Sequence, residues 1–224
     1  MALLHYNPPT TPYLQIVYRD DDLIILDKPS GLLSVPGKAA EHKDSLALRV
    51  ARVWPEARIV HRLDMATSGL IVMALGKDNH RTLSRQFELR QTHKRYEARV
   101  WGVPQDTTGT VNLPLICDWP NRPKQKVDMD NGKPSETHWQ VLARGNHQTL
   151  MSLTPITGRS HQLRVHMLSL GHPILGDRLY AHEQALAMAP RLQLHACELG
   201  LTHPRTGEDL HFHSPSGFRV DCAD

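Results

Sequence analysis

One acidic residue in this sequence has a setting that could support chemistry. Asp64 lies in the stretch His61-Arg62-Leu63-Asp64-Met65-Ala66-Thr67-Ser68-Gly69, between a basic residue and a turn of small residues. Apolar runs at 59–60 and 70–75 predict a strand on each side, with Ser68-Gly69 as the turn. A carboxylate at the end of a buried strand costs free energy unless a cation or hydrogen bonds meet it. Asp64 is therefore either the charged group of a site or a turn residue paired with Arg62, the commoner role for such an aspartate.

Two further segments carry residue types that could act together with this carboxylate. Tyr96 lies in Lys94-Arg95-Tyr96-Glu97-Ala98-Arg99-Val100, and Arg164 lies in the stretch 158–166. A guanidinium beside Asp64 would keep the carboxylate charged in a dry pocket through a charge-assisted hydrogen bond. A tyrosine could stack on a planar ring or accept a proton. Taken singly, Tyr96 is typical of a half-buried strand and Arg164 of a solvated helix, and a buried ion pair can be purely structural.

Other chemistries find little support in the sequence. The chain has 15 histidines but no His-Glu-x-x-His motif, and His161 and His166 are five residues apart, which does not place them on one helix face. We therefore predict no metal site. The Gly-x-Ser-x-Gly pattern of a serine nucleophile is absent. The segment 157–160 could offer backbone N–H groups to an anion but lacks the ending of a P-loop, so nucleotide hydrolysis is not predicted.

Length and composition favour a cytoplasmic protein. The 224 residues suit one domain with two lobes, and no apolar run is long enough to span a bilayer. The N-terminus lacks the basic and apolar regions of a signal peptide. Cys117, Cys197 and Cys222 are scattered without a Cys-x-x-Cys pair, so we expect reduced thiols rather than a disulfide framework or a zinc site.

The distribution of charge indicates a polyanionic partner more strongly than the net charge of +3 does. Between Lys77 and Arg99, seven basic residues stand against three acidic ones, and a second basic cluster lies among prolines beside Trp119. Basic patches near an aromatic residue suit nucleic acid, although a solvated helix face would look much the same. The residues that we expect to contact an RNA backbone are Arg81, Arg85, Lys94, Arg95, Arg122, Lys124, Lys126 and Arg159.

Patterning predicts more strands than helices. Hairpins are expected over 13–18 and 23–26, over 137–143 and 149–154, and over 192–201 and 209–213, with a further strand over 94–101. Helices are expected over 45–53 with Asp44 as N-cap, after an N-cap at Asp78, over 160–170 as an amphipathic helix, and near 183–188. The segment 107–134 is expected to be irregular and partly mobile. This order predicts an α+β fold with a large, mostly antiparallel sheet.

Taken together, the motifs have a specific likeness. The stretches His-Arg-Leu-Asp-x-x-Thr-Ser-Gly-Leu (61–70), Lys-x-Tyr-x-Ala-x-Val (94–100) and Gly-Arg-Ser-His-Gln-Leu-Arg-Val-His (158–166), followed by Leu194-His195-Ala196, resemble the pseudouridine synthases of the RluA family. The resemblance runs from the segment 27–32 to the terminal hairpin. The segments 113–127 and 171–196 resemble a branch of that family that modifies both 23S rRNA and the anticodon stem-loop of certain tRNAs.

The resemblance implies an enzyme that isomerises uridine in RNA. It implies a single catalytic domain over 1–224, without an S4 RNA-binding domain, in which a large mixed sheet with flanking helices and loops borders a central active-site cleft. No cofactor or metal is expected, since the reaction involves no redox change, and we expect a monomer. The implied catalytic residues are Asp64, Tyr96 and Arg164, and the implied substrate-binding residues are Arg62, Leu194, His61 and Thr67.

Two other functions remain open at this point. A catalytically silent RNA-binding or ribosome-assembly protein could share the fold, although an intact Asp64, Tyr96 and Arg164 argue against it. A glycosidase-type hydrolase normally needs two facing carboxylates, and only Asp64 has a strong setting here.

Overall fold

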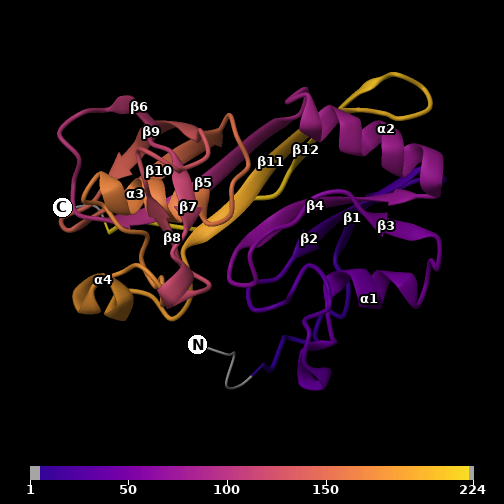
Figure 1. Ribbon diagram of the computed structural model, residues 1–224, viewed down its shortest axis with the longest axis horizontal. Coiled ribbons are helices and arrows are strands. Elements are labelled where there is room, and N and C mark those ends of the chain that lie inside the picture. The colour runs from indigo at the N-terminus through magenta and orange to yellow at the C-terminus, as the bar shows by residue number, and fades with distance from the viewer. Residues whose placement is uncertain (1–5, 222–224) are drawn as a thin grey trace. The chain divides into compact units, whose positions relative to one another are not determined.

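The computed structural model describes residues 6–221 (Figure 1). The described chain forms two compact units. The first unit contains residues 6–94 and 195–216, and the second contains residues 95–194 and 217–221. No helix in the described residues is both long and apolar enough to cross a membrane.

In the first unit, strands surround the long buried strand β4. Its neighbours in order are β1, β2, β4 and β11, with β3 also paired to β4 and β12 to β11. All of these pairs are antiparallel except β4 with β11, so the sheet is mixed. The elements of this unit are β1 (Ile16–Arg19), β2 (Leu23–Lys28), η1 (Ala40–His42), α1 (Leu46–Ala51), β3 (Ala57–Ile59), β4 (Ser68–Leu75), α2 (Lys77–Glu88), β11 (Leu194–Thr202) and β12 (Asp209–His213).

Strand β4 supplies the centre of this core because both of its faces are covered. All eight of its residues are buried, which explains why the sequence shows a continuous apolar run rather than an alternation. Leu83 of α2 is buried in this cluster and Phe87 packs on it, since residues four apart lie on one face of a helix. The buried members of the cluster are Leu23, Ile25, Leu70, Val72, Ala74, Leu83, Leu199 and Leu201.

In the second unit, the strands follow the order β5, β10, β9 and β6, all antiparallel. A separate two-stranded hairpin, β7 with β8, packs beside α3. The elements of this unit are β5 (His93–Trp101), β6 (Thr108–Asn112), β7 (Leu115–Cys117), η2 (Trp119–Asn121), β8 (Gln125–Val127), β9 (Glu136–Arg144), β10 (Gln148–Pro155), α3 (Gln162–Ser169) and α4 (Glu183–Ala187). The prediction of an α+β fold with a large, mostly antiparallel sheet is confirmed.

Several local predictions are wrong, each for a physical reason. The N-cap of α1 is Ser45, whose hydroxyl accepts the N–H of Leu48, because the carboxylate of Asp44 instead pairs with the buried Arg49 at 2.7 Å. Helix α2 begins after Gly76, and Asp78 lies within its first turn. The segment 107–134, expected to be irregular, contains three strands.

Helix α3 also differs from its prediction. It was expected to be amphipathic, but six consecutive residues from Gln162 to Met167 are buried. The polar members of this run are accommodated by specific partners rather than by solvent, as described below for Arg164. Of the cysteines, Cys197 is buried and Cys117 is half-buried, and neither of these two forms a disulfide. Cys222 lies outside the described residues.

The start of β4 requires glycine. Gly69 has a φ of +114°, and a Cβ at this position would lie 2.4 Å from the carbonyl oxygen of Ala196. This close approach arises because β4 and β11 run in parallel with Gly69 opposite Ala196. The glycine of the motif at 67–69 is therefore explained by packing of one backbone against another.

We predict that Gly69→Ala severely destabilises the protein, because the methyl group would collide with backbone that cannot move aside. We expect a loss of at least about 3 kcal/mol in the free energy of unfolding, measured by urea denaturation. Gly76→Ala is the matched control, since Gly76 also has a positive φ (+80°) but nothing within 4 Å of an added Cβ. Gly76 has a ψ of 168°, so backbone strain alone should cost this variant about 1–3 kcal/mol, less than strain and collision together at Gly69. Equal losses in the two variants would contradict the packing explanation.

Candidate active site

The loop that carries Asp64 is held by the segment 28–34 of the same unit. Ser34 donates its hydroxyl to the carbonyl oxygen of Leu63 at 2.7 Å and accepts the N–H of Leu63 at 3.1 Å. Ser30 donates its hydroxyl to the carbonyl oxygen of Ala66 at 2.7 Å. The two serines therefore fix the backbone on both sides of Asp64.

The remaining carbonyl groups of this loop are also satisfied. The carbonyl oxygen of Met65 accepts the N–H of Gly31 at 2.8 Å and the ammonium of Lys28 at 3.2 Å. The carbonyl oxygen of Asp64 itself accepts the N–H of Thr67 at 3.1 Å, which closes a tight turn. All four carbonyls from 63 to 66 thus have donors, so the position of the Asp64 backbone is determined by its own unit.

Lys28 is the unusual member of this support. Its side chain is fully buried, and its ammonium also donates to the carbonyl oxygens of Leu32 at 2.8 Å and Pro29 at 3.0 Å. Burial lowers the pKa of Lys28 to about 7, against the opposing influence of the Asp64 and Asp27 carboxylates. Lys28 therefore holds the segment 28–34 and the Asp64 loop together from the interior, through carbonyl oxygens of both.

The end of the loop is tied to β11 through a chain of buried polar groups. The hydroxyl of Ser68 lies 2.9 Å from Nδ1 of His195, and Nε2 of His195 lies 3.1 Å from the carbonyl oxygen of Ser214. These partners place the ring proton on Nε2, so that Nδ1 accepts the hydroxyl hydrogen of Ser68. The hydroxyl of Ser214 in turn donates to the carboxylate of Asp27. The imidazole of His195 therefore joins two strands at the loop that bears Asp64.

The other predicted site residues of the first unit differ in their surroundings. Thr67 is buried and serves the turn described above, whereas Arg62 is exposed. The ring of His61 stacks on Phe87 with centroids 4.4 Å apart, and its Nε2 accepts the N–H of Val72 at 3.1 Å. Burial, with a smaller effect from Lys94, lowers the pKa of His61 to about 3, so this imidazole is neutral. These contacts support a packing role for His61, and its assignment to substrate binding stays a prediction.

Tyr96, Arg164 and Leu194 belong to the second unit. Tyr96 is half-buried on β5, opposite Leu153 of β10. Leu194 is 3% exposed at the start of β11. The predicted pairing of Asp64 with Arg164 would join residues of the two units, and it stays a prediction.

Arg164 has a carboxylate partner that sequence reasoning missed. Its Nε and Nη2 atoms donate to the two carboxylate oxygens of Asp177 at 2.8 and 2.7 Å. Both side chains are almost completely buried, at 5% and 1% exposure. This bidentate geometry fixes the plane of the guanidinium, which a lone helix arginine would not maintain.

Tyr180 completes the surroundings of Arg164. The guanidinium carbon of Arg164 lies 5.1 Å from the centre of the Tyr180 ring, within the range of a cation–π contact. The hydroxyl of Tyr180 accepts the N–H of Gln125 at 2.7 Å and lies 2.6 Å from Nδ1 of His161. Asp177 and Tyr180 both lie in the segment 171–196. An acid and an aromatic residue close to loop glycines and a proline are the sequence feature that could have marked them as site residues.

The predicted RNA-contacting residues are distributed over both units. Arg81 and Arg85 are exposed on α2, and Lys94 lies with its ammonium 5.9 Å from the centre of the Phe87 ring. Arg95 pairs with Glu97 at 3.2 Å, and Arg159 donates from Nε to the carbonyl oxygen of Pro134 at 3.2 Å. Arg122, Lys124 and Lys126 belong to the β7–β8 hairpin or to the turn that joins its strands. Their contacts with RNA stay predictions.

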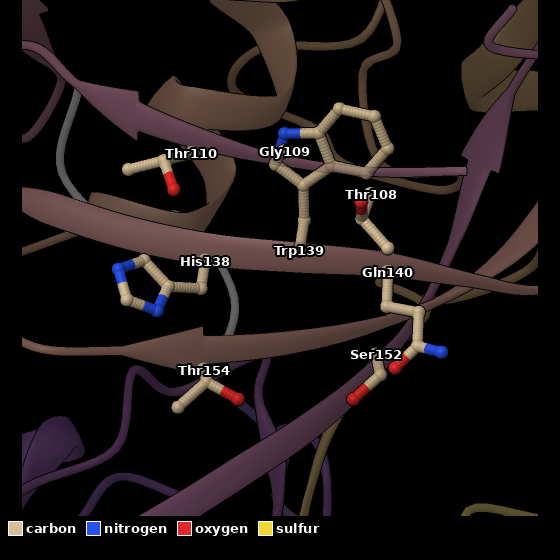
Figure 2. A pocket seen from close by; sticks show the side chains of 8 residues that line it. All are labelled: Thr108, Gly109, Thr110, His138, Trp139, Gln140, Ser152 and Thr154. Atoms are coloured by element: carbon tan, nitrogen blue, oxygen red, sulfur yellow. The ribbon is translucent and has the colours of Figure 1, made fainter. Parts of the chain in front are cut away.

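Two other features could have held a ligand. A hollow of about 340 Å³ lies over β6, β9 and β10. Figure 2 shows the residues that line it, with the indole of Trp139 against Gly109. None of the predicted site residues lines it, and its one ionisable side chain, His138, pairs with Glu136 at 2.7 Å. The arrangement offers hydroxyl and amide groups but no pair of groups suited to acid–base chemistry.

A group of Asp20, Asp22 and His203 has the spacing of a metal site. Both carboxylates already have partners within the chain, because Nε of Arg205 lies 2.8 Å from Asp22 and Nε2 of His203 lies 3.0 Å from Asp20. Nδ1 of His203 accepts the N–H groups of two following residues, which leaves the proton on Nε2. The group therefore joins the β1–β2 and β11–β12 turns by hydrogen bonds and ion pairs.

Comparison with known proteins identifies the class to which this fold and these residues belong. Residues 22–169 match the family model described as RNA pseudouridylate synthase. The matched region includes Asp64, Tyr96 and Arg164. The chain belongs to the RNA pseudouridylate synthase family.

Individual relatives within this family are similar over most of the chain. The dual-specificity RNA pseudouridine synthase RluA of Escherichia coli is 58% identical over 219 residues, which is 97% of this chain and 100% of that protein. The protein of the same name from Vibrio cholerae is 56% identical, covering 92% of this chain and 84% of its own length. The solved structure of human RNA pseudouridylate synthase domain containing 1 has a TM-score of 0.79 at 30% identity, covering 93% of this chain and 86% of that one.

The buried ammonium of Lys28 predicts a specific dependence of stability on pH. Since folding lowers the pKa of Lys28 to about 7 from an ordinary 10.5, the unfolded chain holds more protons than the folded chain between these values. The free energy of unfolding should therefore gain roughly 1 kcal/mol per pH unit from this residue as pH rises through that window. Below about pH 7 the contribution should be constant.

Comparing the wild type with Lys28→Met by urea denaturation from pH 6 to pH 9 measures this contribution. The free energy of unfolding of the wild type, minus that of Lys28→Met, should rise with pH above about 7. Lys43→Met is the matched control, because the Lys43 ammonium also donates to two carbonyl oxygens but is exposed. Parallel curves for the wild type and Lys28→Met would contradict the assignment.

Proposed function

We propose that this chain isomerises uridine to pseudouridine in stem-loop RNA and that Asp64 is its essential carboxylate. Family membership over 22–169 supports the reaction, and the fixed backbone around Asp64 supports the residue. In this reaction the bond from N1 of uracil to C1′ of the ribose breaks, the base turns, and C5 bonds to C1′. The proton on C5 leaves and N1 gains one, so the reaction has no net redox change and needs no cofactor or metal.

The residues have distinct roles in this proposal. Asp64 acts as nucleophile or general base, so it must be ionised when uridine enters. Arg164, with its plane fixed by Asp177, supports that charge, while the ammonium of Lys28 supports it from within the first unit. Tyr96 stacks on the uracil ring and removes the C5 proton, directly or through water. Leu194 provides an apolar wall for the base, and Thr67 holds the turn.

The substrate must be opened before it can react. A stacked uridine cannot reach a carboxylate, so the nucleotide is everted at a cost of about a few kcal/mol. Arg62, exposed two residues before Asp64, holds the displaced nucleotide or fills the gap that it leaves. Loop nucleotides are less costly to evert than paired ones. This favours stem-loops as targets.

Two classes of RNA are proposed as substrates. The relatives named above are dual-specificity RNA pseudouridine synthases and cover nearly all of this chain. We propose that the targets here are 23S rRNA and the anticodon stem-loop of tRNA, modified in the cytoplasm by a monomer. A silent RNA-binding protein on the same fold is the second candidate function, and the following experiment separates the two.

The first test of the proposal removes the negative charge of Asp64 while nearly keeping the shape of its side chain. Asp64→Asn should bind a synthetic anticodon stem-loop within about two-fold of the wild type but lose at least about 10³-fold in turnover, since the amide cannot act as nucleophile or base. Tritium release from RNA labelled at uridine C5 measures turnover. The matched control is Asp78→Asn, because Asp78 is an exposed carboxylate on α2. Turnover at near wild-type rates by Asp64→Asn would exclude Asp64 as the essential group.

The second test concerns the RNA backbone. If exposed cations contact phosphates, the logarithm of the RNA affinity should fall linearly with the logarithm of salt concentration. Arg85→Gln and Lys126→Gln should each reduce that slope by about one. Lys38→Gln, an exposed lysine outside both basic clusters, should leave it unchanged. Fluorescence anisotropy at several salt concentrations measures the slope, and an equal slope in all four proteins would rule these two cations out as phosphate contacts.

A further inference from the structure

The tip of the β7–β8 hairpin exposes an indole ring. Trp119 has 67% of its surface exposed, and among the large apolar residues of the described chain only Met129, at 71%, is more exposed. Single exposed apolar residues are common, so exposure alone decides nothing. The surroundings of the ring are more informative.

The turn that carries Trp119 is well ordered by hydrogen bonds. Asp118 donates its N–H to the carbonyl oxygen of Lys124 at 2.9 Å, and Lys124 donates to that of Asn121 at 3.1 Å. Asn121 donates both its backbone N–H and its side-chain amide to Asp118, each at 2.9 Å. An aromatic ring on such a turn loses little conformational entropy when it binds a ligand.

The guanidinium of Arg122 stacks over this indole. Its central carbon lies 4.1 Å from the centre of the Trp119 ring. Aromatic rings and guanidinium planes are the groups on which proteins stack the unpaired bases of RNA, because both present flat, weakly hydrated surfaces. The pair therefore forms a platform whose chemistry suits a nucleobase.

The charge around the platform also suits RNA. The hairpin from 115 to 127 contains three cations, Arg122, Lys124 and Lys126, against the single acid Asp118. Lys126 is exposed and lies on the opposite side of β8 from Gln125, since side chains alternate along a strand. One indole among cations is too small an apolar surface to hold a protein partner, which favours a polyanion with flat bases.

The platform is joined to the surroundings of Arg164. The N–H of Gln125 in β8 donates to the hydroxyl of Tyr180, whose ring lies against the guanidinium of Arg164. Strand β8 also packs on α3, which carries Arg164. A nucleotide stacked on Trp119 would therefore be held by the same unit that positions Arg164.

We infer that Trp119, backed by Arg122, is a stacking subsite for an unpaired base of the RNA substrate other than the uridine that is isomerised. Lys124 and Lys126 contact the phosphates beside that base. This inference rests on the proposed function in one respect, since RNA is taken to be the ligand. It adds a second point of recognition, at which the enzyme selects RNA that can present a further unstacked base.

The test measures RNA affinity by fluorescence anisotropy in the Asp64→Asn background, where turnover does not interfere. Trp119→Ala should weaken binding of a synthetic anticodon stem-loop by roughly 5- to 100-fold, the usual effect of removing one base-stacking side chain. Trp119→Phe should recover a large part of the loss. Met129→Ala is the matched control, because Met129 is equally exposed in the same segment, and it should bind as the parent does. A closed duplex without loop nucleotides should bind all four proteins alike.

A set of stem-loops with one loop base removed at a time then locates the partner of Trp119. At one loop position other than the target uridine, removing the base should weaken the RNA affinity of the parent. The RNA affinity of Trp119→Ala should not change at that position, because the base removal and the substitution remove the same contact. Equal affinities of Trp119→Ala and Met129→Ala for the stem-loop would overturn the inference, as would a loss of the same size on the duplex. If Trp119→Ala keeps its RNA affinity but no longer binds a protein partner that the parent binds, the inference is overturned as well.

Failure of this inference is distinguishable from failure of the proposed function. Uridine conversion, measured with Asp64 intact, reports on the function alone. Conversion by the wild type with no effect of Trp119→Ala on affinity would reject only the stacking subsite. Affinity that depends on Trp119 in a protein that converts no uridine would reject only the isomerase.

Discussion

A carboxylate can act as a nucleophile or base only if its backbone stays in place, and here that constraint is met by hydrogen bonds to every carbonyl of the loop around it. The donors come from two serine hydroxyls, two N–H groups and one buried ammonium, all within the first unit. A buried carbonyl left without a donor costs about 1–3 kcal/mol, so no single contact can be lost without strain on the others. The position of Asp64 is thereby determined before any substrate binds.

The second unit meets an equivalent requirement for Arg164. A guanidinium on a helix whose first six residues are all buried needs a permanent partner, and Asp177 provides one with two parallel hydrogen bonds. Breaking such a buried pair typically costs about 3–5 kcal/mol, so the pair also stabilises the unit that it orders. The ring of Tyr180 then connects this arginine with the β7–β8 hairpin, so that the predicted catalytic cation and the basic hairpin share one set of contacts.

The sequence predicted most strands, because strands depend on local patterns, whereas the catalytic roles of Asp64, Tyr96 and Arg164 stay predictions. Alternation and turn residues located the hairpins, and the apolar run at 70–75 located β4. Supporting residues were missed where their partners are distant in sequence: Lys28 binds the carbonyl of Met65, 37 positions away, and Asp177 binds Arg164, 13 positions away. The helix caps predicted at Asp44 and Asp78 are wrong. The carboxylate of Asp44 pairs with the buried Arg49 instead of capping α1, and the N-cap of α2 is Gly76 rather than Asp78.

Helix α3 illustrates the limit of periodicity. Its pattern predicted one buried face, and the buried polar residues around that face could be identified only from their partners, Gln162 with Thr157 and His166 with Thr137. The sequence predicted Ser68-Gly69 as the turn, but both residues belong to β4 and the turn lies at 64–67. The approach of Ala196 that forbids a side chain at Gly69 depends on a parallel strand from the other end of the chain.

The most direct test of the account is a map of pseudouridine, made by chemical labelling of total RNA from cells with and without this protein. We expect at least one site in 23S rRNA and one in a tRNA anticodon stem-loop to disappear without the protein and to return with the wild type but not with Asp64→Asn. An identical map in its presence and absence, or full restoration by Asp64→Asn, would contradict the account.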